Sequence, residues 1–227
     1  MVARISSLLI GYAFGGLLTA EVVCLTLVHK SSFEVGQGNP GMANVGHELG
    51  TKAALAVLAG DILKTLLAWM VARTVFADAA GGADAAGLWA GLGATLGHNY
   101  PFWHRFHGGK GVTTTCSAII LTSPLWGIAA SLLGFAVVVL SGYLCVGAVA
   151  ICGAFFLFTL LVGTSEQAAV ALVLTLLMLR AHWGKIRGIA DGTTRRATLS
   201  DKVWDRLRKK GGKDRGGKDG AKGDAET

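Results

Sequence analysis

The sequence predicts an all-α fold, a multi-pass transmembrane helical bundle for which we expect seven helices. Of the 227 residues, 52% are hydrophobic and only 15% are charged, which is typical of an integral membrane protein. Several apolar runs reach or approach the roughly 20 residues that cross about 30 Å of hydrocarbon as a helix. The charged residues lie mainly between these runs and in the C-terminal tail.

The first three runs each predict one helix. We expect helices from about Ile5 to Val28 and over Ala53–Phe76, because both runs are long enough to span a membrane. The first follows a short start, as a signal peptide does, but no clear small-residue cleavage site follows it, so we expect it to be retained. A weaker run rich in glycine and alanine, from about Ala83 to Leu96, predicts a third helix, because small residues allow close packing in membranes.

The long apolar block from Val112 to Leu179 must contain several helices. The candidate breaks are residues 123–124, 141–142 and 163–166, because proline, glycine and polar clusters interrupt helices. These breaks divide the block into four helices and bring the total to seven. With fewer breaks, a five-crossing bundle also fits.

An odd number of crossings places the two termini on opposite sides of the membrane. The C-terminal tail carries more lysines and arginines than any loop, so the positive-inside rule predicts a cytoplasmic C-terminus. All six histidines then lie on the cytoplasmic side: His29, His47, His98, His104, His107 and His182.

We predict two parts, a transmembrane domain over residues 1–196 and a cytoplasmic, mixed-charge, disordered tail over 197–227. Much of the formal net charge of +7 comes from this tail, so we expect no nucleic-acid partner. The four cysteines fall in apolar segments without a CxxC spacing, so neither a metal site nor a disulfide framework is expected.

The first cytoplasmic loop reads EVGQGNPGMANVGHELG, from Glu34 to Gly50. Three glycines surround an Asn-Pro pair, and their backbone freedom allows several N–H groups to converge on an anion. An ordinary turn between helices is the alternative. Asn44 and His47 nearby favour a binding role.

The second loop reads GHNYPFWHRFHGGKGVTTT, from Gly97 to Thr115. A Gly-Gly-Lys-Gly step at a helix N-terminus offers free N–H groups, a favourable dipole and one cation, which together suit a phosphate. It lacks the spacing of a Walker A motif. The alternative is an interfacial loop in which Arg105 and Lys110 meet lipid headgroups and Trp103 anchors the chain.

Two further features carry charge. The stretch LRAHWGKIRGIADGTTRR, from Leu179 to Arg196, brings basic residues to the membrane exit, which the positive-inside rule alone explains. In the second predicted helix, Asp61 and Lys64 lie on one face, roughly 13 to 18 Å below the helix start. Ionisable groups at that depth need a partner or a polar cavity, so this pair is either structural or supports a polar site.

Together these stretches resemble the bacterial acyl-phosphate-dependent glycerol-3-phosphate acyltransferases (PlsY). The resemblance rests on GQGNPGMAN, GDILK, GHNYPFWHRFHGGKGVTTT and the stretch after His182, and it extends to about Arg196. It implies a multi-pass enzyme of the bacterial plasma (inner) membrane, with its motifs and C-terminus in the cytoplasm. The implied reaction transfers a fatty acyl group from acyl phosphate to the 1-position of glycerol 3-phosphate, giving lysophosphatidic acid and phosphate. The implied partners are the two substrates and the lipid bilayer, and neither coenzyme A, another cofactor nor a metal is implied.

The resemblance also assigns site residues. Lys110 and the loop Gly108–Gly111 would hold a phosphate, and the loop Gly38–Gly41 would donate N–H groups to another phosphate or to the developing oxyanion. His98 would act as general base, or it would only orient the substrate while the leaving phosphate accepts the proton. The candidate catalytic residues are His98, Lys110 and Asn39, and the candidate substrate-binding residues are Gln37, Gly38, Gly41, Asn44, Gly108, Gly109, Gly111, Cys145, His182 and Lys185.

Several positions depart from the family pattern, mainly in the first and third motifs. Gln37 replaces serine, Ala43 threonine, His47 arginine, Gly142 arginine, Cys145 serine, Lys185 asparagine, Gly188 arginine and Thr194 glutamate. These departures leave open a divergent, non-catalytic relative. An organic-phosphate carrier is a further alternative, although the one-sided polar groups and the lack of an apparent inverted repeat disfavour it.

Overall fold

The computed structural model describes residues 1–79 and 81–197, and within them it is all-helical. The predicted fold class is therefore confirmed, while most of the predicted tail, residues 198–227, lies outside the described residues. The helices are α1 (Val2–Gly15), α2 (Thr19–Val28), α3 (Met42–Leu49), α4 (Thr51–Val75), α5 (Gly82–Asn99), α6 (Val112–Thr122), α7 (Pro124–Ser141), α8 (Leu144–Val162) and α9 (Ser165–Ala190), with a short 3-10 turn at Phe102–His104.

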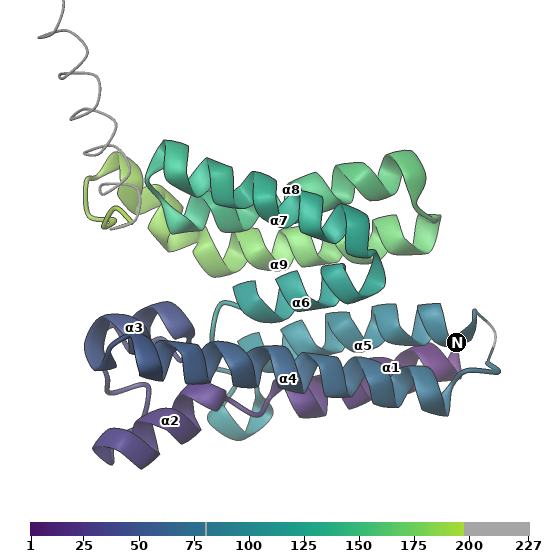
Figure 1. Cartoon of the computed structure of the whole chain (residues 1–227), viewed down its shortest axis with the longest axis horizontal. Helices are drawn as coiled ribbons and strands as arrows, with labels where there is room; N and C mark the ends of the chain where they lie inside the picture. The colour runs from purple at the N-terminus through teal and green to yellow at the C-terminus, as the bar shows by residue number, and fades with distance from the viewer. Residues whose placement is uncertain (80, 198–227) are drawn as a thin grey trace, which may run out of the picture.

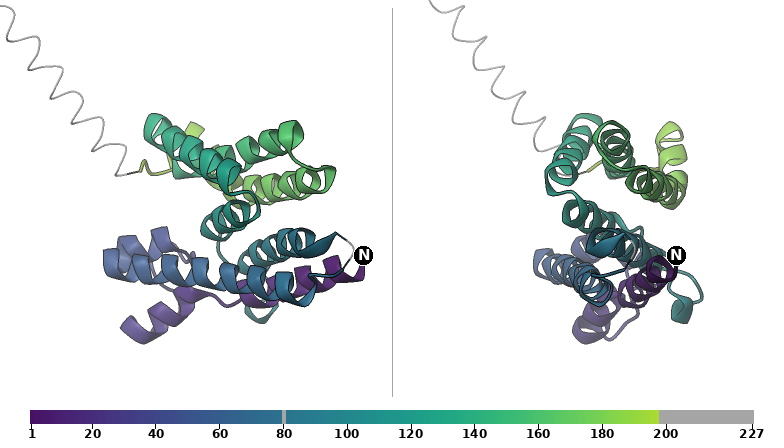
Figure 2. Two further views of the ribbon diagram at one scale, coloured as in Figure 1. Left: turned by 45° about the vertical axis from the view of Figure 1, so that its right-hand side comes forward. Right: turned by 90° about the vertical axis from the view of Figure 1, so that its right-hand side faces the viewer.

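The helices form two groups joined by α6 (Figures 1 and 2). In the first group α1 and α4 pack on α5, and in the second α8 packs between α7 and α9. The short helices α2 and α3 lie beside the first half of α4. Figure 1 shows α3 and the end of α9 at the end of the molecule opposite the N-terminus, so the loops expected to share one face gather there.

The described chain is an integral membrane protein by length, composition and surface. Five segments are long and apolar enough to cross a membrane: Val2–Val28, Thr51–Val75, Pro124–Ser141, Leu144–Val162 and Ser165–Ala190. Large apolar side chains face outward from them, as Leu161, 81% exposed, illustrates, and such a surface requires a lipid environment. Helix α5 and the shorter α6 are the other two candidates, so seven crossings stay a prediction.

The apolar block divides at the three predicted breaks. Pro124 begins α7 directly after α6, Gly142 ends α7 in the left-handed region, and Thr164 caps α9. The Thr164 cap is reciprocal, because its hydroxyl accepts from the N–H of Gln167 while the Gln167 side chain accepts from the N–H of Thr164. The four helices expected from this block are all present.

The first apolar run is not one helix, and that expectation was wrong. The chain breaks between Gly15 and Thr19, where carbonyl groups that would continue a helix are used by distant side chains. The Trp103 indole donates to the Gly16 carbonyl at 2.9 Å, and the Lys64 ammonium donates to the Leu17 carbonyl at 2.9 Å. Similarly, the first loop contains α3, and the second loop begins only after Asn99.

Glycines allow α1 and α5 to touch backbone to backbone. A Cβ on Gly11 would lie 2.0 Å from the carbonyl oxygen of Ala90, and one on Gly97 would lie 2.1 Å from that of Tyr12. Close approach through small residues is the usual way in which membrane helices associate. It fixes the end of α5, where His98 lies, against the break between α1 and α2.

Candidate active site

Asn44 builds the first loop from the first turn of α3. Its side-chain oxygen accepts from the N–H of Gln37 at 2.8 Å, and its side-chain nitrogen donates to the Val35 carbonyl at 2.8 Å. Gly36 and Gly38 have positive φ angles, of 58° and 66°, which glycine adopts without strain. Asn44, expected to bind substrate, therefore uses its amide to shape the loop that presents Gln37.

The glycines of the second loop lie directly against His98. The Gly109 N–H donates to the His98 carbonyl at 2.9 Å. A Cβ on Gly109 would lie 2.1 Å from Nε2 of His98, and one on Gly108 would lie 2.1 Å from the His98 carbonyl oxygen. Gly111, with φ of 71°, is the N-cap of α6. Only glycine fits at positions 108 and 109. The loop therefore forms a tight cradle before the N-terminus of α6.

Lys110 lies in the middle of this cradle. Burial lowers the pKa of the Lys110 ammonium below its ordinary value, the positive charge of Lys185 lowers this pKa further, and the interaction with Cys145 opposes both effects. Lys110 therefore lies within electrostatic range of Lys185 at the end of α9 and of Cys145 at the start of α8. An anion placed among them would remove the cost of holding the two ammonium groups together.

A buried polar network lies beneath the second loop and includes the Asp61–Lys64 pair. Lys64 is 5% exposed, and its ammonium is 2.8 Å from the Asp61 carboxylate, 2.9 Å from the Leu17 carbonyl and 2.9 Å from Nδ1 of His98. The Thr19 hydroxyl donates to the same carboxylate at 3.1 Å. The pair is therefore not isolated, because it supports His98 and so the loop above it.

This network determines which nitrogen of His98 carries the proton. An ammonium has three N–H donors and no acceptor, and Lys64 has three acceptors around it, so Nδ1 of His98 accepts. The neutral imidazole then carries its hydrogen on Nε2, the atom that faces Gly109. In this tautomer His98 is a donor toward the loop and has no free lone pair there.

The third stretch joins the first through Lys185. Its ammonium donates to the Gln37 side-chain oxygen at 3.1 Å, and its carbonyl accepts from the Thr194 hydroxyl at 2.6 Å. Another contact between the two stretches joins Arg195 and His47, whose nitrogens lie 3.4 Å apart. The three stretches expected to share one site therefore meet at one end of the bundle.

His182 and Asn99 are both buried polar residues. His182 is buried, and its Nδ1–H donates to the Met178 carbonyl one turn earlier on α9 at 3.1 Å. Asn99, not selected from the sequence, is 4% exposed, and both polar atoms of its amide lack a hydrogen-bond partner among the described residues. It lies under Gly111, whose Cβ would meet the Asn99 oxygen at 2.4 Å.

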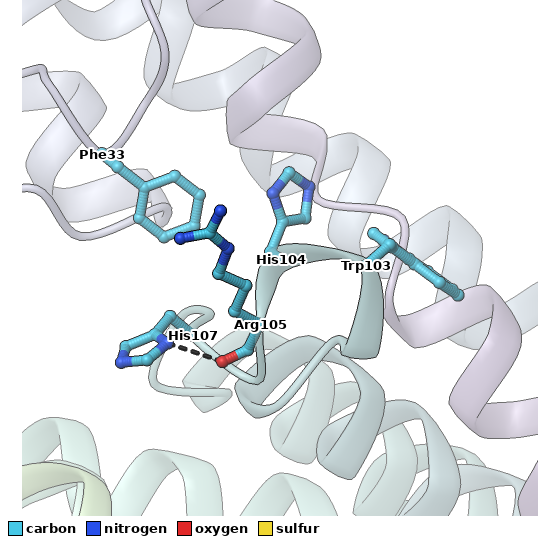
Figure 3. A pocket seen from close by; sticks show the side chains of 5 residues that line it. All are labelled: Phe33, Trp103, His104, Arg105 and His107. Atoms are coloured by element: carbon cyan, nitrogen blue, oxygen red, sulfur yellow. Dashed lines mark hydrogen bonds between the residues drawn. The ribbon is translucent and has the colours of Figure 1, made fainter.

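An open pocket of about 430 Å³ is formed largely by the second loop, and Lys110 is not among its lining residues (Figure 3). It is lined by Phe33, Trp103, His104, Arg105 and His107. Figure 3 shows the Arg105 side chain directed toward Phe33, and the His107 ring donates to the Arg105 carbonyl at 2.7 Å. Arg105 is exposed here whereas Lys110 is partly buried, so the interfacial interpretation of the loop fits Arg105 and Trp103 but not Lys110.

Fold and site together define an integral membrane protein with a cationic, glycine-lined site of the kind that binds anionic groups. Residues 5–192 match the family model described as Glycerol-3-phosphate acyltransferase. The chain therefore belongs to the glycerol-3-phosphate acyltransferase family, as the motif resemblance indicates.

Individual relatives agree with this assignment. Glycerol-3-phosphate acyltransferase 1 of Lactobacillus johnsonii is 36% identical over 76% of this chain and 82% of its own length. The protein of the same name from Lactobacillus acidophilus is 32% identical over 87% of this chain and 93% of its own length. The crystal structure of PlsY (YgiH), an integral membrane glycerol 3-phosphate acyltransferase, in its glycerol 3-phosphate form has a TM-score of 0.76 and 25% identity, covering 88% of this chain and 98% of that chain.

Proposed function

We propose that this protein transfers a fatty acyl group from acyl phosphate to the 1-position of glycerol 3-phosphate, releasing lysophosphatidic acid and inorganic phosphate. Its place is the bacterial inner membrane, with the site open to the cytoplasm. The names of the relatives support glycerol 3-phosphate as acceptor. The donor and the position of acylation come from the motif resemblance.

The observation that carries the proposal is the meeting of Gln37, Lys110 and Lys185 at one site. These residues come from three distant parts of the chain, and the Lys185 ammonium bridges to Gln37 at 3.1 Å while its charge acts on Lys110. Two ammonium groups beside two glycine-rich loops suit two phosphorylated substrates. One such substrate carries an alkyl chain, which the surrounding bilayer would accept.

The reaction needs little beyond charge stabilisation and alignment. The glycerol hydroxyl attacks the acyl carbonyl, a tetrahedral oxyanion forms, and the bond between the carbonyl carbon and the bridging oxygen breaks as phosphate leaves with the electron pair. Lys110 would stabilise the negative charge that develops on the phosphate, and N–H groups of the loop Gly38–Gly41 would donate to the oxyanion.

The hydroxyl proton goes to the leaving phosphate in this mechanism. His98 is a poor base in its present tautomer, because Nδ1 accepts from Lys64 and Nε2 carries hydrogen. The geometry supports a positioning role for His98, which holds Gly109 and thereby Lys110. Of the two roles that the sequence left open for His98, we therefore propose the second.

Phosphate release by the purified protein in detergent tests the function. We expect palmitoyl phosphate to release phosphate only when glycerol 3-phosphate is added, with the acyl chain appearing at the 1-position of the product. A carrier or a silent relative would show no release that depends on the acceptor, and that result would reject the proposal.

Lys110→Ala tests the site. Removing a charge-assisted contact of about 1.5–3 kcal/mol should raise the KM for a phosphorylated substrate at least about ten-fold, or abolish turnover. Lys52→Ala, which changes an exposed lysine at the start of α4, is the matched control. Unchanged kinetics of Lys110→Ala would remove Lys110 from the site.

A further inference from the structure

The chain beyond α9 turns back and crosses to the corner between α7 and α8. The N–H groups of Thr193 and Thr194 donate to the Gly188 carbonyl at 2.9 and 3.0 Å. The segment 191–197 then reaches the corner, where the Ala197 N–H donates to the Gly142 carbonyl at 2.7 Å. We call this segment the C-terminal strap, because it ties the end of α9 to the start of α8.

The strap places the guanidinium of Arg196 beside Gly142, where the lack of a side chain leaves room for it. A Cβ on Gly142 would lie 2.6 Å from Nη2 and 2.7 Å from Cζ of Arg196. The Cζ atom also lies over the Tyr143 ring, 5.5 Å from its centroid, where an arginine gains cation–π attraction. Gly142 itself has φ of 83°, so both backbone and space favour glycine at this corner.

This corner adjoins the candidate site from two directions. Gly142 lies three positions before Cys145, and Ala148 and Cys152 further along α8 pack with Val112, which directly follows the second loop. On the other side, Thr194 donates to the Lys185 carbonyl at 2.6 Å, so the strap is bonded to the residue that contacts Gln37. Arg196 is therefore held between the two elements that carry Cys145 and Lys185.

We propose that Arg196 is a phosphate-binding residue of this site, presented at the Gly142 corner by the C-terminal strap. The inference rests on the proposed function and extends it, because it adds a third cation to Lys110 and Lys185. A guanidinium presents a planar set of donors that matches a phosphate in a bidentate manner, which an ammonium does not. The bound group is a phosphate of either substrate, and separate kinetic measurements on the two substrates distinguish them.

Substitution of Arg196 in the full-length protein provides the kinetic test. Arg196→Gln keeps most of the side-chain length without charge, and a charge-assisted contact of about 1.5–3 kcal/mol corresponds to roughly a ten- to hundred-fold rise in KM. The rise should affect glycerol 3-phosphate or palmitoyl phosphate, whichever contributes the phosphate, and Arg196→Lys should recover part of it. Arg187→Ala, an exposed arginine on the last turns of α9, is the control.

A binding measurement separates this inference from the proposed function. Glycerol 3-phosphate or inorganic phosphate should raise the unfolding midpoint of the wild type in detergent, and this increase should shrink in Arg196→Gln but not in Arg187→Ala. If the wild type transfers no acyl group yet shows this pattern, the proposed reaction fails and the Arg196 site stands.

Two results would overturn the assignment of Arg196. One is an Arg196→Gln protein whose KM values and phosphate-dependent stabilisation both match the wild type. The other is a lower unfolding midpoint and lower kcat in Arg196→Gln and Arg196→Lys alike with both KM values unchanged, because that pattern means that the strap has a structural role only.

Discussion

Gly109 lies against the imidazole of His98, so a larger residue at this position would push the second loop away from His98. We predict that Gly109→Ala lowers kcat/KM by at least about a hundred-fold, since a displacement of about 1 Å can cost that much, and its Cβ would lie 2.1 Å from Nε2 of His98. Steady-state kinetics of the purified variant measures the loss.

Gly184→Ala is the matched control for this substitution. Gly184 lies on α9, where an added Cβ meets nothing within 4 Å. Alanine should stabilise that helix by about 0.4–1 kcal/mol and leave the kinetics as they are. A fully active Gly109→Ala protein would show that the contact with His98 does not position Lys110.

The pH dependence of substrate binding should depend on Lys110. Burial, and then the charge of Lys185, lower the pKa of Lys110 below its ordinary value of 10.5. The ammonium is the binding form, so binding is strongest below this lowered pKa and is lost as the pH rises through it. We predict that the KM for a phosphorylated substrate rises on the alkaline side, at a pH below 10.5.

Two variants test the origin of this alkaline limb. Lys110→Arg should move the limb to higher pH, because a guanidinium stays charged there. Lys185→Gln should also move it to higher pH by removing the neighbouring charge. If both variants keep the wild-type profile, another group titrates and the limb does not report Lys110.

Local chemistry predicts some site residues and not others. The Gly-Gly-Lys-Gly step indicates a phosphate site by itself, because its flexible amides and its cation are adjacent in sequence. Arg196 resembles any other basic residue at a membrane exit. Its place at Gly142 depends on a hydrogen bond between Ala197 and a residue 55 positions earlier, which no local pattern encodes.

At the scale of the elements, the bundle depends on a helix break that hydropathy does not detect. The run Val2–Val28 is apolar throughout, and composition alone predicts one helix. The break arises because Trp103 and Lys64 take the carbonyl groups of Gly16 and Leu17. Breaks at proline and at Gly142 in the later block are local signals and were predicted correctly.

The Asp61–Lys64 pair should stabilise the chain at this break, because Lys64 donates to Leu17 and Asp61 accepts from Thr19. Lys64→Met leaves the 2%-exposed Asp61 carboxylate without its ammonium, and removing one partner of a buried ion pair costs about 3–5 kcal/mol. We predict a clear fall in the thermal unfolding midpoint in detergent. Asp61→Asn combined with Lys64→Met should lose less, because no unpaired charge remains buried.

Both substitutions should also lower activity, because Lys64 supports His98. Lys52→Ala, exposed on the same helix, is the control for both measurements. An equal loss of stability in the single and double variants would show that the pair contributes packing rather than charge compensation.

At the scale of the whole molecule, different polar contacts join the helices at the two ends of the bundle. At the end that carries the N-terminus, Arg4 on α1 pairs with Glu166 at the start of α9, and the Trp89 indole donates to the same carboxylate at 2.6 Å. At the other end the strap and Lys185 join the motif loops. Composition predicts which residues are charged, but only the packing of α1 and α9 on α5 determines which of them pair.

The number of crossings can be decided by the sidedness of two loops. Asp78 lies in the exposed turn between α4 and α5, and His107 is exposed in the second loop after α5. With seven crossings the two loops face opposite compartments, whereas a bundle in which only the five most apolar segments cross places both on the same side.

We predict that Asp78→Cys reacts with a membrane-impermeant maleimide in right-side-out vesicles, and that His107→Cys reacts only in inverted ones. The unaltered chain is the blank, because three of its four cysteines are buried and the fourth is partly buried. Labelling of both variants from one side would show that α5 does not cross the membrane.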